Sequence, residues 1–219
     1  MYKFYLLLLL PLSNNTCKKE NISNTDCNQP VAYIKEYTTL TSKNWEYFSE
    51  KDLTIKTQQS GVYEQTNDGL KIYADGYRNA RLSSFEKVCV ENKVLYVKWK
   101  CEDGNMFNEY CVSLYYDKNG YGGDNKARTD ITRFTTHNSW NNSVVIDPDT
   151  WYFTRIQIVD GTAIAVTAIN DYNTNGGTVI ESVNTPLKGT TGYVAIRVGD
   201  SYGGNDATIT LNNFLITDK

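Results

Sequence analysis

Side chains suited to acid–base catalysis are scattered along this sequence and form no recognisable pair. The nearest approach to a pair is Glu102 followed by Asp103. Adjacent residues on a strand point to opposite faces, so these two carboxylates cannot share one cleft. His137 is the only histidine and lies in the polar segment TTHNSWNN, where a lone imidazole is usually solvated rather than a general base. There is no GxSxG nucleophile motif either, so the residues indicate no reaction.

Aromatic side chains mixed with amides and cations indicate a different chemistry, the recognition of sugars. A sugar ring has an apolar face bordered by hydroxyl groups, so its binding sites combine an exposed aromatic ring with Asn, Asp, Arg or Lys. The predicted ligand-binding residues, which lie at expected outward or loop positions, are Tyr96, Lys98, Tyr115, Tyr121, Asn125, Arg128, Trp140 and Asn141. Trp140 is the main candidate for the platform because HNSWNN supplies no core neighbours for it. The alternative is that the rings only cover the surface of a sheet.

The elements that must position these side chains are predicted to be β-strands. The chain of 219 residues contains 17 Tyr and 15 Gly, and its formal charge of -3 leaves no broad basic surface for nucleic acid. From Val31 onward, short apolar runs alternate with Gly, Asn and Asp clusters, a pattern typical of antiparallel strands. Asp160-Gly161 predicts a hairpin with a type I′ turn. The clearest strand-like runs are 70–74, 88–90, 94–99, 110–116, 131–135, 143–146, 152–159, 162–169, 178–182, 192–198 and 207–216.

So many strands exceed one flat sheet and suit two packed sheets. Alternation along each strand then predicts which side chains face the core. The predicted inward set is Leu95, Val97, Trp99, Val112, Leu114, Tyr116, Val194, Ile196 and Val198. The predicted outward set is Tyr96, Lys98, Ser113, Tyr115 and Arg197. Trp45 and Trp151 join Trp99 as expected core residues because of their apolar company.

The first thirty residues predict export. Lys3 precedes a short apolar run from Leu6 to Leu12, which is too short to span a bilayer. The stretch resembles bacterial lipoprotein signals, and that resemblance implies a signal peptide over residues 1–16 and an acylated Cys17. Residues 17–30 would then form a lipidated, polar tether to a domain spanning residues 31–219. The alternative is an ordinary signal peptide, with Cys17 free or bridged, and a secreted or periplasmic protein.

The cysteine count agrees with an exported chain. Removing a lipidated Cys17 leaves four cysteines, Cys27, Cys89, Cys101 and Cys111. An even set outside the cytoplasm predicts disulfides, and three pairings are possible. Neighbouring strands could pair two of the last three, and Cys27 could staple the lead-in to the sheet. Zinc is not expected, because the sequence has no CxxC pair and a single histidine.

The C-terminal sequence resembles the closing half of concanavalin A-like, laminin-G-like jelly rolls. The segments are DTWYFTRIQIVDGTAIAVTAIN, GTVIESV, GTTGYVAIRVGD and GGNDATITLNNFLIT. The positions that carry the resemblance are Trp151, Arg155, Ile156, Gly161, Gly192, Ile196, Arg197, Asn212, Asn213 and Phe214. It implies an all-β, two-sheet antiparallel jelly-roll sandwich. This fold hosts lectins, carbohydrate-binding modules, glycosidases, lyases and adhesion domains, so the resemblance is specific for fold and not for function.

The resemblance also supplies tests for catalysis and for metal. The ExDxE or ExDxxE pattern of the glycosidases with this fold is absent, and the residues around Arg155 and Gln157 do not match the motif of alginate-lyase-type jelly rolls. Related jelly rolls often hold a structural calcium ion near the first and last strands, using an Asp of the final strand. Asn212 stands at that place, and Asp206 is a second candidate ligand. Asn lacks the carboxylate charge, so calcium affinity should fall.

Together these observations predict an exported protein, held at the outer membrane or cell surface by a lipid anchor alone. Its expected function is the binding of a glycan or polysaccharide without catalysis. One alternative is a divergent glycoside hydrolase or polysaccharide lyase, which would need a catalytic set converging in the concave groove. The other is a laminin-G-like protein-binding module, which would be favoured if the concave face lacked a groove and exposed aromatic rings.

Overall fold

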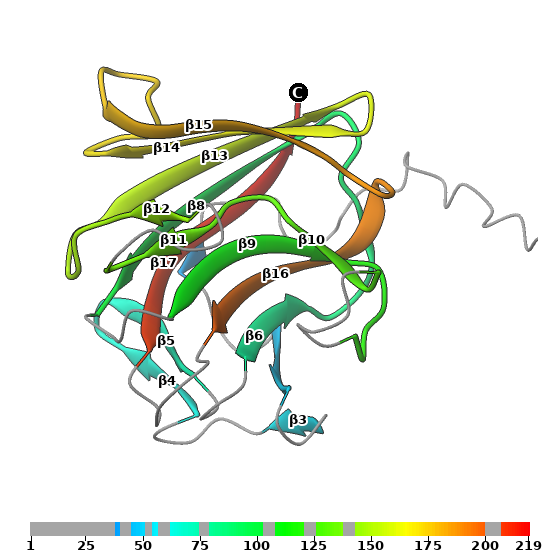
Figure 1. The fold of residues 1–219 in the computed structure, drawn as a ribbon, viewed down its shortest axis with the longest axis horizontal. Helices are drawn as coiled ribbons and strands as arrows, with labels where there is room; N and C mark the ends of the chain where they lie inside the picture. The colour runs from blue at the N-terminus through cyan, green and yellow to red at the C-terminus, as the bar shows by residue number, and fades with distance from the viewer. Residues whose placement is uncertain are drawn as a thin grey trace, which may run out of the picture.

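The computed structural model describes residues 38–39, 45–50, 54–56, 62–74, 79–102, 108–120, 126–137, 143–199 and 207–219. Over these ranges the regular elements are all β-strands, arranged in two sheets. Figure 1 shows the sheets stacked face to face, with β9 and β16 of the lower sheet curving away from the upper one. The predicted all-β, two-sheet jelly-roll sandwich is confirmed. None of the described residues belongs to a helix long and apolar enough to cross a bilayer.

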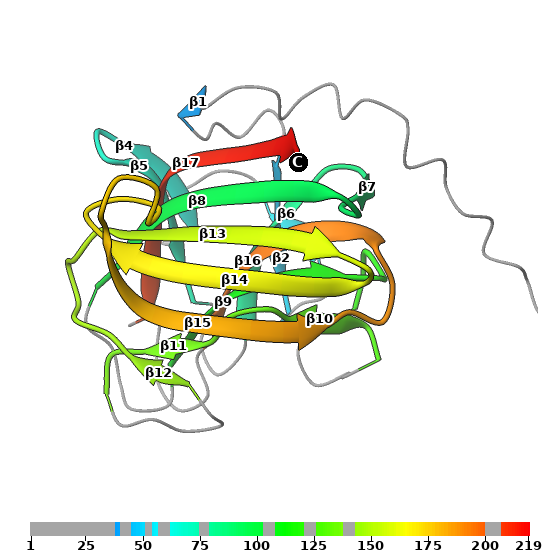
Figure 2. The same ribbon diagram turned by 90° about the horizontal axis from the view of Figure 1, so that it is seen from above.

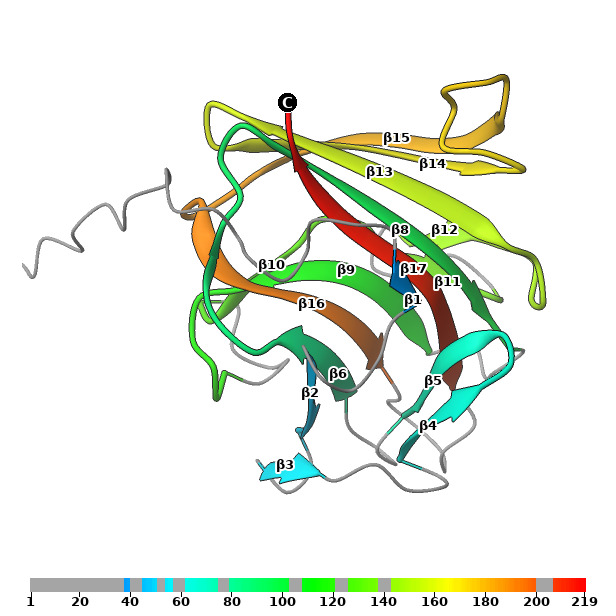
Figure 3. The ribbon, with the colours of Figure 1, turned by 180° about the vertical axis from the view of Figure 1, so that it is seen from behind.

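Sheet A has eight strands, and all its pairings are antiparallel. Figure 2 shows its long strands side by side, and Figure 3 shows β4 and β5 at the lower end of β17. In spatial order the strands are β15 (Thr178–Pro186), β14 (Thr162–Ile169), β13 (Tyr152–Val159), β8 (Lys93–Cys101), β17 (Thr208–Asp218), β5 (Gly69–Tyr73) and β4 (Tyr63–Thr66). The eighth strand, β1 (Thr38–Thr39), pairs with β17.

Sheet B has nine strands, and only β11 and β12 pair in parallel within the described ranges. In spatial order they are β12 (Val144–Val145), β11 (Phe134–Thr135), β9 (Glu109–Tyr115), β16 (Thr191–Gly199), β6 (Asn79–Ser84), β2 (Trp45–Ser49) and β3 (Thr54–Lys56). Two short strands complete the sheet: β10 (Arg128–Asp130) pairs with β9, and β7 (Val88–Cys89) pairs with β16.

The core lies between the sheets and contains most of the predicted inward set. Leu95, Val97 and Trp99 from β8 are buried there, as the alternation of β8 requires. They face the predicted residues of β9 and β16, namely Val112, Leu114, Val194, Ile196 and Val198. Tyr116 packs against this core while half-buried. Trp45 is also in the core, but Trp151 is half-buried outside it, so the prediction for Trp151 is wrong.

Two tight backbone features fix the geometry of sheet A. Asp160 and Gly161 have φ angles of 50° and 68°, so the hairpin between β13 and β14 has the predicted positive-φ turn. The second feature is a bulge in β17 between Leu211 and Asn213. Gly69 packs against it, and a Cβ atom there would lie 2.1 Å from the Leu211 carbonyl oxygen. Only glycine fits at this approach.

The cysteines behave differently from the predicted strand-to-strand pairing. Cys101 and Cys111, one in each sheet, are buried and are not disulfide-bonded. Cys89 is disulfide-bonded. Cys17 and Cys27 lie outside the described residues, so a staple from Cys27 and lipidation of Cys17 stay predictions.

Candidate functional site

The ribbon of sheet B curves so that the face pointing away from the core is concave (Figure 1). This face carries charged side chains, which form buried ion pairs. Because Val112 and Leu114 of β9 face the core, Cys111, Ser113 and Tyr115 must face the other way. The register places Arg197 of β16 beside Cys111, and Arg81 of β6 beside Arg197. Strand pairing therefore gathers on one surface residues that are far apart in sequence.

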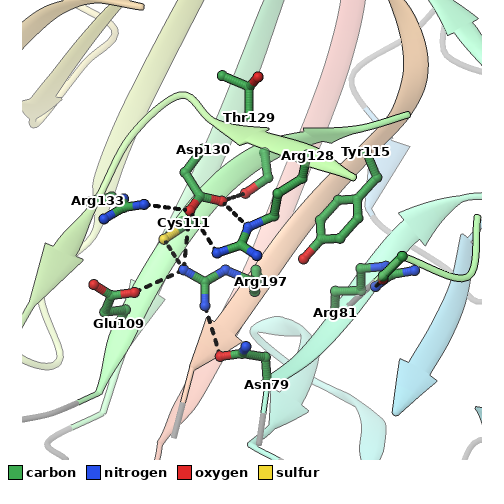
Figure 4. Close-up of polar contacts among 12 residues, drawn as sticks. Asn79, Arg81, Glu109, Cys111, Tyr115, Arg128, Thr129, Asp130, Arg133 and Arg197 are labelled. Atoms are coloured by element: carbon green, nitrogen blue, oxygen red, sulfur yellow. Dashed lines mark hydrogen bonds and ion pairs between the residues drawn. The ribbon is translucent and has the colours of Figure 1, made fainter. Parts of the chain in front are cut away.

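Asp130 is the centre of this charged group (Figure 4). Its carboxylate accepts two hydrogen bonds from Arg128, at 2.8 and 3.0 Å, and one from Ser113 Oγ at 2.6 Å. Arg133 donates to the same carboxylate at 3.0 Å, and an Arg197 amino nitrogen lies 3.5 Å from it. One carboxylate therefore holds three guanidinium groups in place.

Arg197 links Asp130 to the other end of the concave face. Its terminal nitrogens donate to Asn79 Oδ1 at 2.8 Å, Glu109 Oε2 at 2.9 Å and Cys111 Sγ at 3.0 Å. The side chain is only 2% exposed, so these contacts replace its water. Two neighbouring atoms, Arg197 Nε and Glu109 Oε1, are buried without a hydrogen-bond partner.

Arg81 forms the second half of this surface. Its guanidinium lies between two aromatic rings, 4.1 Å from the Phe48 centroid and 4.0 Å from that of Tyr115. The Arg81 side chain also pairs with Glu50, which accepts a hydrogen bond from the Tyr115 hydroxyl at 3.0 Å. Arg81 donates in addition to the carbonyl oxygens of Lys118 and Gly120. The segment after β9 is thereby tied down over the concave face.

We call these connected residues the arginine network: Asn79, Arg81, Glu50, Glu109, Cys111, Ser113, Tyr115, Arg128, Asp130, Arg133 and Arg197. Burial raises the pKa of Asp130, but the charges and hydrogen bonds of Arg197 and Arg128 outweigh it and hold that pKa far below its usual range. Burial raises the pKa of the Cys111 thiol to about 12. Burial, reinforced by the Glu50 charge, also raises the pKa of Tyr115.

The lowered pKa of Asp130 does not suit this residue to the role of a general acid. A general acid needs a proton near neutral pH, whereas Asp130 is held ionised. Tyr115 faces away from the core, as the strand alternation predicts, but it is fully buried, so the prediction that it is an exposed ligand contact is wrong. The Arg81 guanidinium packs on its ring, and its hydroxyl donates a hydrogen bond to Glu50. Arg197 follows the same pattern, since it faces away from the core and is nevertheless buried.

The outer face of sheet A is different, because its aromatic rings are half-exposed. The register places Lys98 of β8 opposite Phe153 of β13, and Tyr96 opposite Arg155. The Lys98 Nζ atom lies 4.9 Å from the Trp151 ring centroid and 5.5 Å from that of Phe153. Tyr172 packs edge-on against both Tyr96 and Phe153, with centroids 5.1 Å apart in each pair. We call Tyr96, Lys98, Trp151, Phe153 and Tyr172 the aromatic platform.

A structured loop between β14 and β15 supplies Tyr172 to the platform (Figure 1). The Asp171 carboxylate accepts hydrogen bonds from the backbone nitrogens of Tyr172 at 2.7 Å and Asn175 at 2.9 Å. Asn173 adopts a φ of 60°, a conformation that asparagine tolerates well. The loop therefore holds its aromatic ring in a defined position over the sheet.

The predicted site residues divide among these surfaces. Tyr96 and Lys98 belong to the aromatic platform, whereas Tyr115 and Arg128 belong to the arginine network. Tyr121, Asn125, Trp140, Asn141 and Asp206 lie outside the described residues. Asn212 lies in the β17 bulge and donates to the Asp68 carbonyl oxygen at 2.7 Å. No three His, Cys, Asp or Glu side chains cluster as a metal site in the described ranges, and calcium bound through backbone oxygens stays a prediction.

Sequence reasoning missed Trp151, Phe153 and Tyr172 as surface residues. Strand parity contained the signal for the first two, because Tyr152, Ile156 and Ile158 all face the core. No comparable signal places Tyr172, since its position depends on how the loop folds back.

No family model and no curated protein matches this sequence. Solved structures do match its fold. An alginate lyase from Corynebacterium sp. superposes with a TM-score of 0.52 at 8% identity, covering 82% of this chain and 96% of that one. The alginate lyase AlgAT5 of polysaccharide lyase family 7 gives a TM-score of 0.51 at 11% identity, with 80% and 94% covered. A legume lectin-like domain from Entamoeba histolytica gives 0.50 at 11% identity, with 80% and 90% covered.

The fold is a concanavalin A-like jelly roll. These identities are low, so they establish the architecture of the jelly roll and not its ligand. Within that architecture, the arginine network occupies the concave sheet and the aromatic platform occupies the opposite one.

Proposed function

We propose that this jelly roll binds a carbohydrate, without transforming it, at the aromatic platform of sheet A. The observation that carries the proposal is a half-exposed group of four aromatic rings with the Lys98 ammonium set between two of them. Apolar sugar faces stack on such rings, and lysine donates hydrogen bonds to the surrounding hydroxyl groups. Gln157, which accepts a hydrogen bond from Arg155 at 3.3 Å, adds polar groups on the same face of β13.

Two further considerations support this ligand class. Solved structures with the same fold are named as alginate lyases and as a legume lectin-like domain, which are proteins that handle saccharides. A binding role without chemistry is supported by the arginine network, where Asp130 is held ionised and Tyr115 is buried. Arg155 and Gln157 lie on the outer face of sheet A and not on the concave face, so they add no catalytic set there.

The test is a glycan array with the purified chain, followed by affinity measurements on any hit. Trp151→Ala should weaken binding about fivefold or more, because stacking on an aromatic ring contributes on the order of 1 kcal/mol or more. Phe85→Ala is the matched control, since Phe85 is 53% exposed and carries the Lys118 Nζ atom 5.0 Å from its ring centroid. Equal affinity of Trp151→Ala and the unaltered chain would remove the platform as the binding site.

A laminin-G-like protein-binding module is the second candidate. The specific observation in its favour is that the central concave residues Arg81, Tyr115 and Arg197 are buried, so these three side chains offer no exposed surface to a glycan. Ile164 and Val179, 38% and 44% exposed, add apolar surface to the strands beside the platform. A blank glycan array, combined with a protein ligand whose binding is lost in Ile164→Asp, would favour this candidate over the first.

We also propose that the chain is exported and attached to the cell surface through an acylated Cys17. Metabolic labelling with a fatty-acid analogue tests the attachment, and Cys17→Ser should abolish the label while leaving export intact. Unchanged labelling of Cys17→Ser would contradict it.

A further inference from the structure

Two cations on the outer face of sheet A, Lys98 and Arg155, form no ion pair with any described residue. The Lys98 ammonium contacts the rings of Trp151 and Phe153, and an Arg155 terminal nitrogen donates to Gln157 Oε1 at 3.3 Å. Both cationic side chains are partly exposed. Cations that keep contact with water and lack a carboxylate partner are available to an anionic ligand.

The strand register explains why the two cations have no carboxylate beside them. β8, which carries Lys98, lies between β17 and β13, and β13, which carries Arg155, lies between β8 and β14 (Figure 2). The residues opposite the two cations on these strands are all uncharged: Asn213, Phe153, Tyr96 and Val166. Strand pairing therefore surrounds both cations with uncharged neighbours.

The same register brings the two cations close to each other. Lys98 lies opposite Phe153 and Arg155 lies opposite Tyr96, so the two cations occupy diagonal positions on β8 and β13. Diagonal neighbours on antiparallel strands are roughly 7–8 Å apart. Two positive charges at this spacing repel each other, and an anion bound between them would replace the repulsion with two attractions.

The other carboxylates of this face have partners of their own. Asp68 pairs with Lys100 at 2.8 Å. Asp171 accepts hydrogen bonds from two backbone nitrogens and one hydroxyl of its own loop. Among the described residues of the platform and its loop, Lys98 and Arg155 thus face one carboxylate that has no ion pair, and an excess of positive charge remains.

We propose that the aromatic platform binds an acidic saccharide, whose carboxylate or sulfate group lies between Lys98 and Arg155. The guanidinium group of Arg155 presents paired N–H donors to the oxyanion, and the Lys98 ammonium adds a less directional charge. The sugar rings stack on the aromatic side chains beside the two cations. This inference rests on the proposed carbohydrate function and names the class of its ligand.

The test adds matched pairs of oligosaccharides to the glycan array, which is probed at constant ionic strength. The acidic members are oligomers of glucuronate, galacturonate and mannuronate, together with dextran sulfate. Their neutral counterparts are oligomers of glucose, galactose and mannose, together with dextran. We expect at least one acidic member to bind about fivefold or more tightly than its counterpart. Equal affinity within every pair, or binding of neutral glycans alone, would overturn the inference.

Trp151→Ala separates a failure of this inference from a failure of the proposed function. If only neutral glycans bind and Trp151→Ala weakens their binding, the platform is the carbohydrate site and the preference for acidic ligands is wrong. If no glycan binds, or if Trp151→Ala leaves every affinity unchanged, the proposed function is wrong and the inference falls with it.

Charge-removing variants test the two cations directly. Lys98→Met and Arg155→Met should each lower the ratio of acidic to neutral affinity about three- to tenfold, whereas Lys98→Arg, which keeps the charge, should retain most of it. Lys87→Met is the matched control, because Lys87 is exposed and its Nζ atom lies 5.9 Å from the ring centroid of Tyr193 on β16. A melting transition close to that of the unaltered chain shows that each variant is folded. An unchanged ratio in both charge-removing variants, or an equal fall in Lys87→Met, would contradict the inference.

Discussion

Both sheets of this molecule place a cation against aromatic rings, but the contact is buried in sheet B and half-exposed in sheet A. On the concave face of sheet B, Arg81 lies between the rings of Phe48 and Tyr115 and is buried. On the outer face of sheet A, Lys98 lies over Trp151 and Phe153 and stays half-exposed. A cation over an aromatic ring therefore identifies no function by itself. Access to solvent decides whether the pair holds the fold together or is available to a ligand.

The free-energy cost of removing a cation from water explains why the two sheets differ. Burying a guanidinium group costs roughly several kcal/mol of hydration free energy. The buried group is stable only when carboxylates and carbonyl oxygens take the place of the water. Arg81 and Arg197 both have such partners. Lys98 keeps much of its hydration and interacts with the rings at little cost. A ligand could replace water at the platform, whereas at Arg81 and Arg197 it would have to break buried ion pairs.

The largest effect is expected from breaking the arginine network at its centre. Asp130→Asn removes the charge that three guanidinium groups share, so we expect the free energy of unfolding to fall by about 3–5 kcal/mol. Asp218→Asn is the control, because its side chain is 87% exposed in its ion pair with Lys93. That exposed pair should be worth at most about 1 kcal/mol. Chemical denaturation measures both, and equal losses would contradict a structural role for the network.

The Cys111 thiol, which lies beside Arg197, gives a second measurement of the effect of Asp130→Asn. Cys111 is buried and protonated in the native protein, so it should react slowly with thiol reagents. Asp130→Asn should speed its labelling relative to Cys101, which lies in the other sheet. Mass spectrometry of labelled peptides gives both rates, and parallel acceleration of the two thiols would point to global unfolding instead.

A smaller change in stability, of opposite sign, is expected at Glu181 of β15, a carboxyl whose pKa is shifted by burial. Burial raises its pKa from 4.5 to about 7, and its Oε2 atom is buried without a hydrogen-bond partner. The folded protein therefore binds the proton more tightly than the unfolded chain, so stability falls as the pH rises from about 4.5 to about 7. Asp130 has the reverse dependence: its stabilisation is present above the unfolded pKa of about 4 and is lost in stronger acid.

Glu181→Gln should remove that pH dependence. After allowance for partial exposure, the variant should be more stable than the unaltered chain by about 1–2 kcal/mol at pH 8 and nearly equal to it at pH 4. Urea denaturation at both pH values measures the difference. A variant that is no more stable at pH 8 would mean that Glu181 is adequately solvated.

The smallest effect on stability is expected at the aromatic platform. Trp151→Ala should lower the free energy of unfolding by about 1 kcal/mol or less, because its ring is half-exposed. Trp99→Ala is the comparison, because the Trp99 ring lies on the opposite, core-facing side of sheet A. This change should lower the free energy of unfolding by about 3–5 kcal/mol, since the ring is buried and its Nε1 donates a hydrogen bond to Thr154 Oγ1. Thermal or urea denaturation measures the stability of both variants. A loss for Trp151→Ala as large as that for Trp99→Ala would show that Trp151 acts as a core residue and would contradict the account.

The sequence predicted the inward-facing residues well where a strand has one buried and one partly exposed face, as in β8 and β13. β8 alternates from Leu95 to Cys101, so Leu95, Val97 and Trp99 were predicted correctly, and Asp160-Gly161 marked the hairpin between β13 and β14. β9 is buried on both faces, and alternation then cannot reveal that Tyr115 is covered. The arginine network was not predictable, since Arg81, Asp130 and Arg197 meet only through the strand order β6-β16-β9-β10.

The most direct test of the division between the two sheets is to map a bound glycan on the protein. With any array hit, amide shifts in an NMR titration should concentrate at residues 96–100, 151–155 and 171–173, on β8, β13 and the loop that carries Tyr172. Residues 109–115 and 193–199, which carry part of the arginine network on β9 and β16, should shift little. Shifts centred on β9 and β16 instead would place the ligand on the concave face and contradict the account.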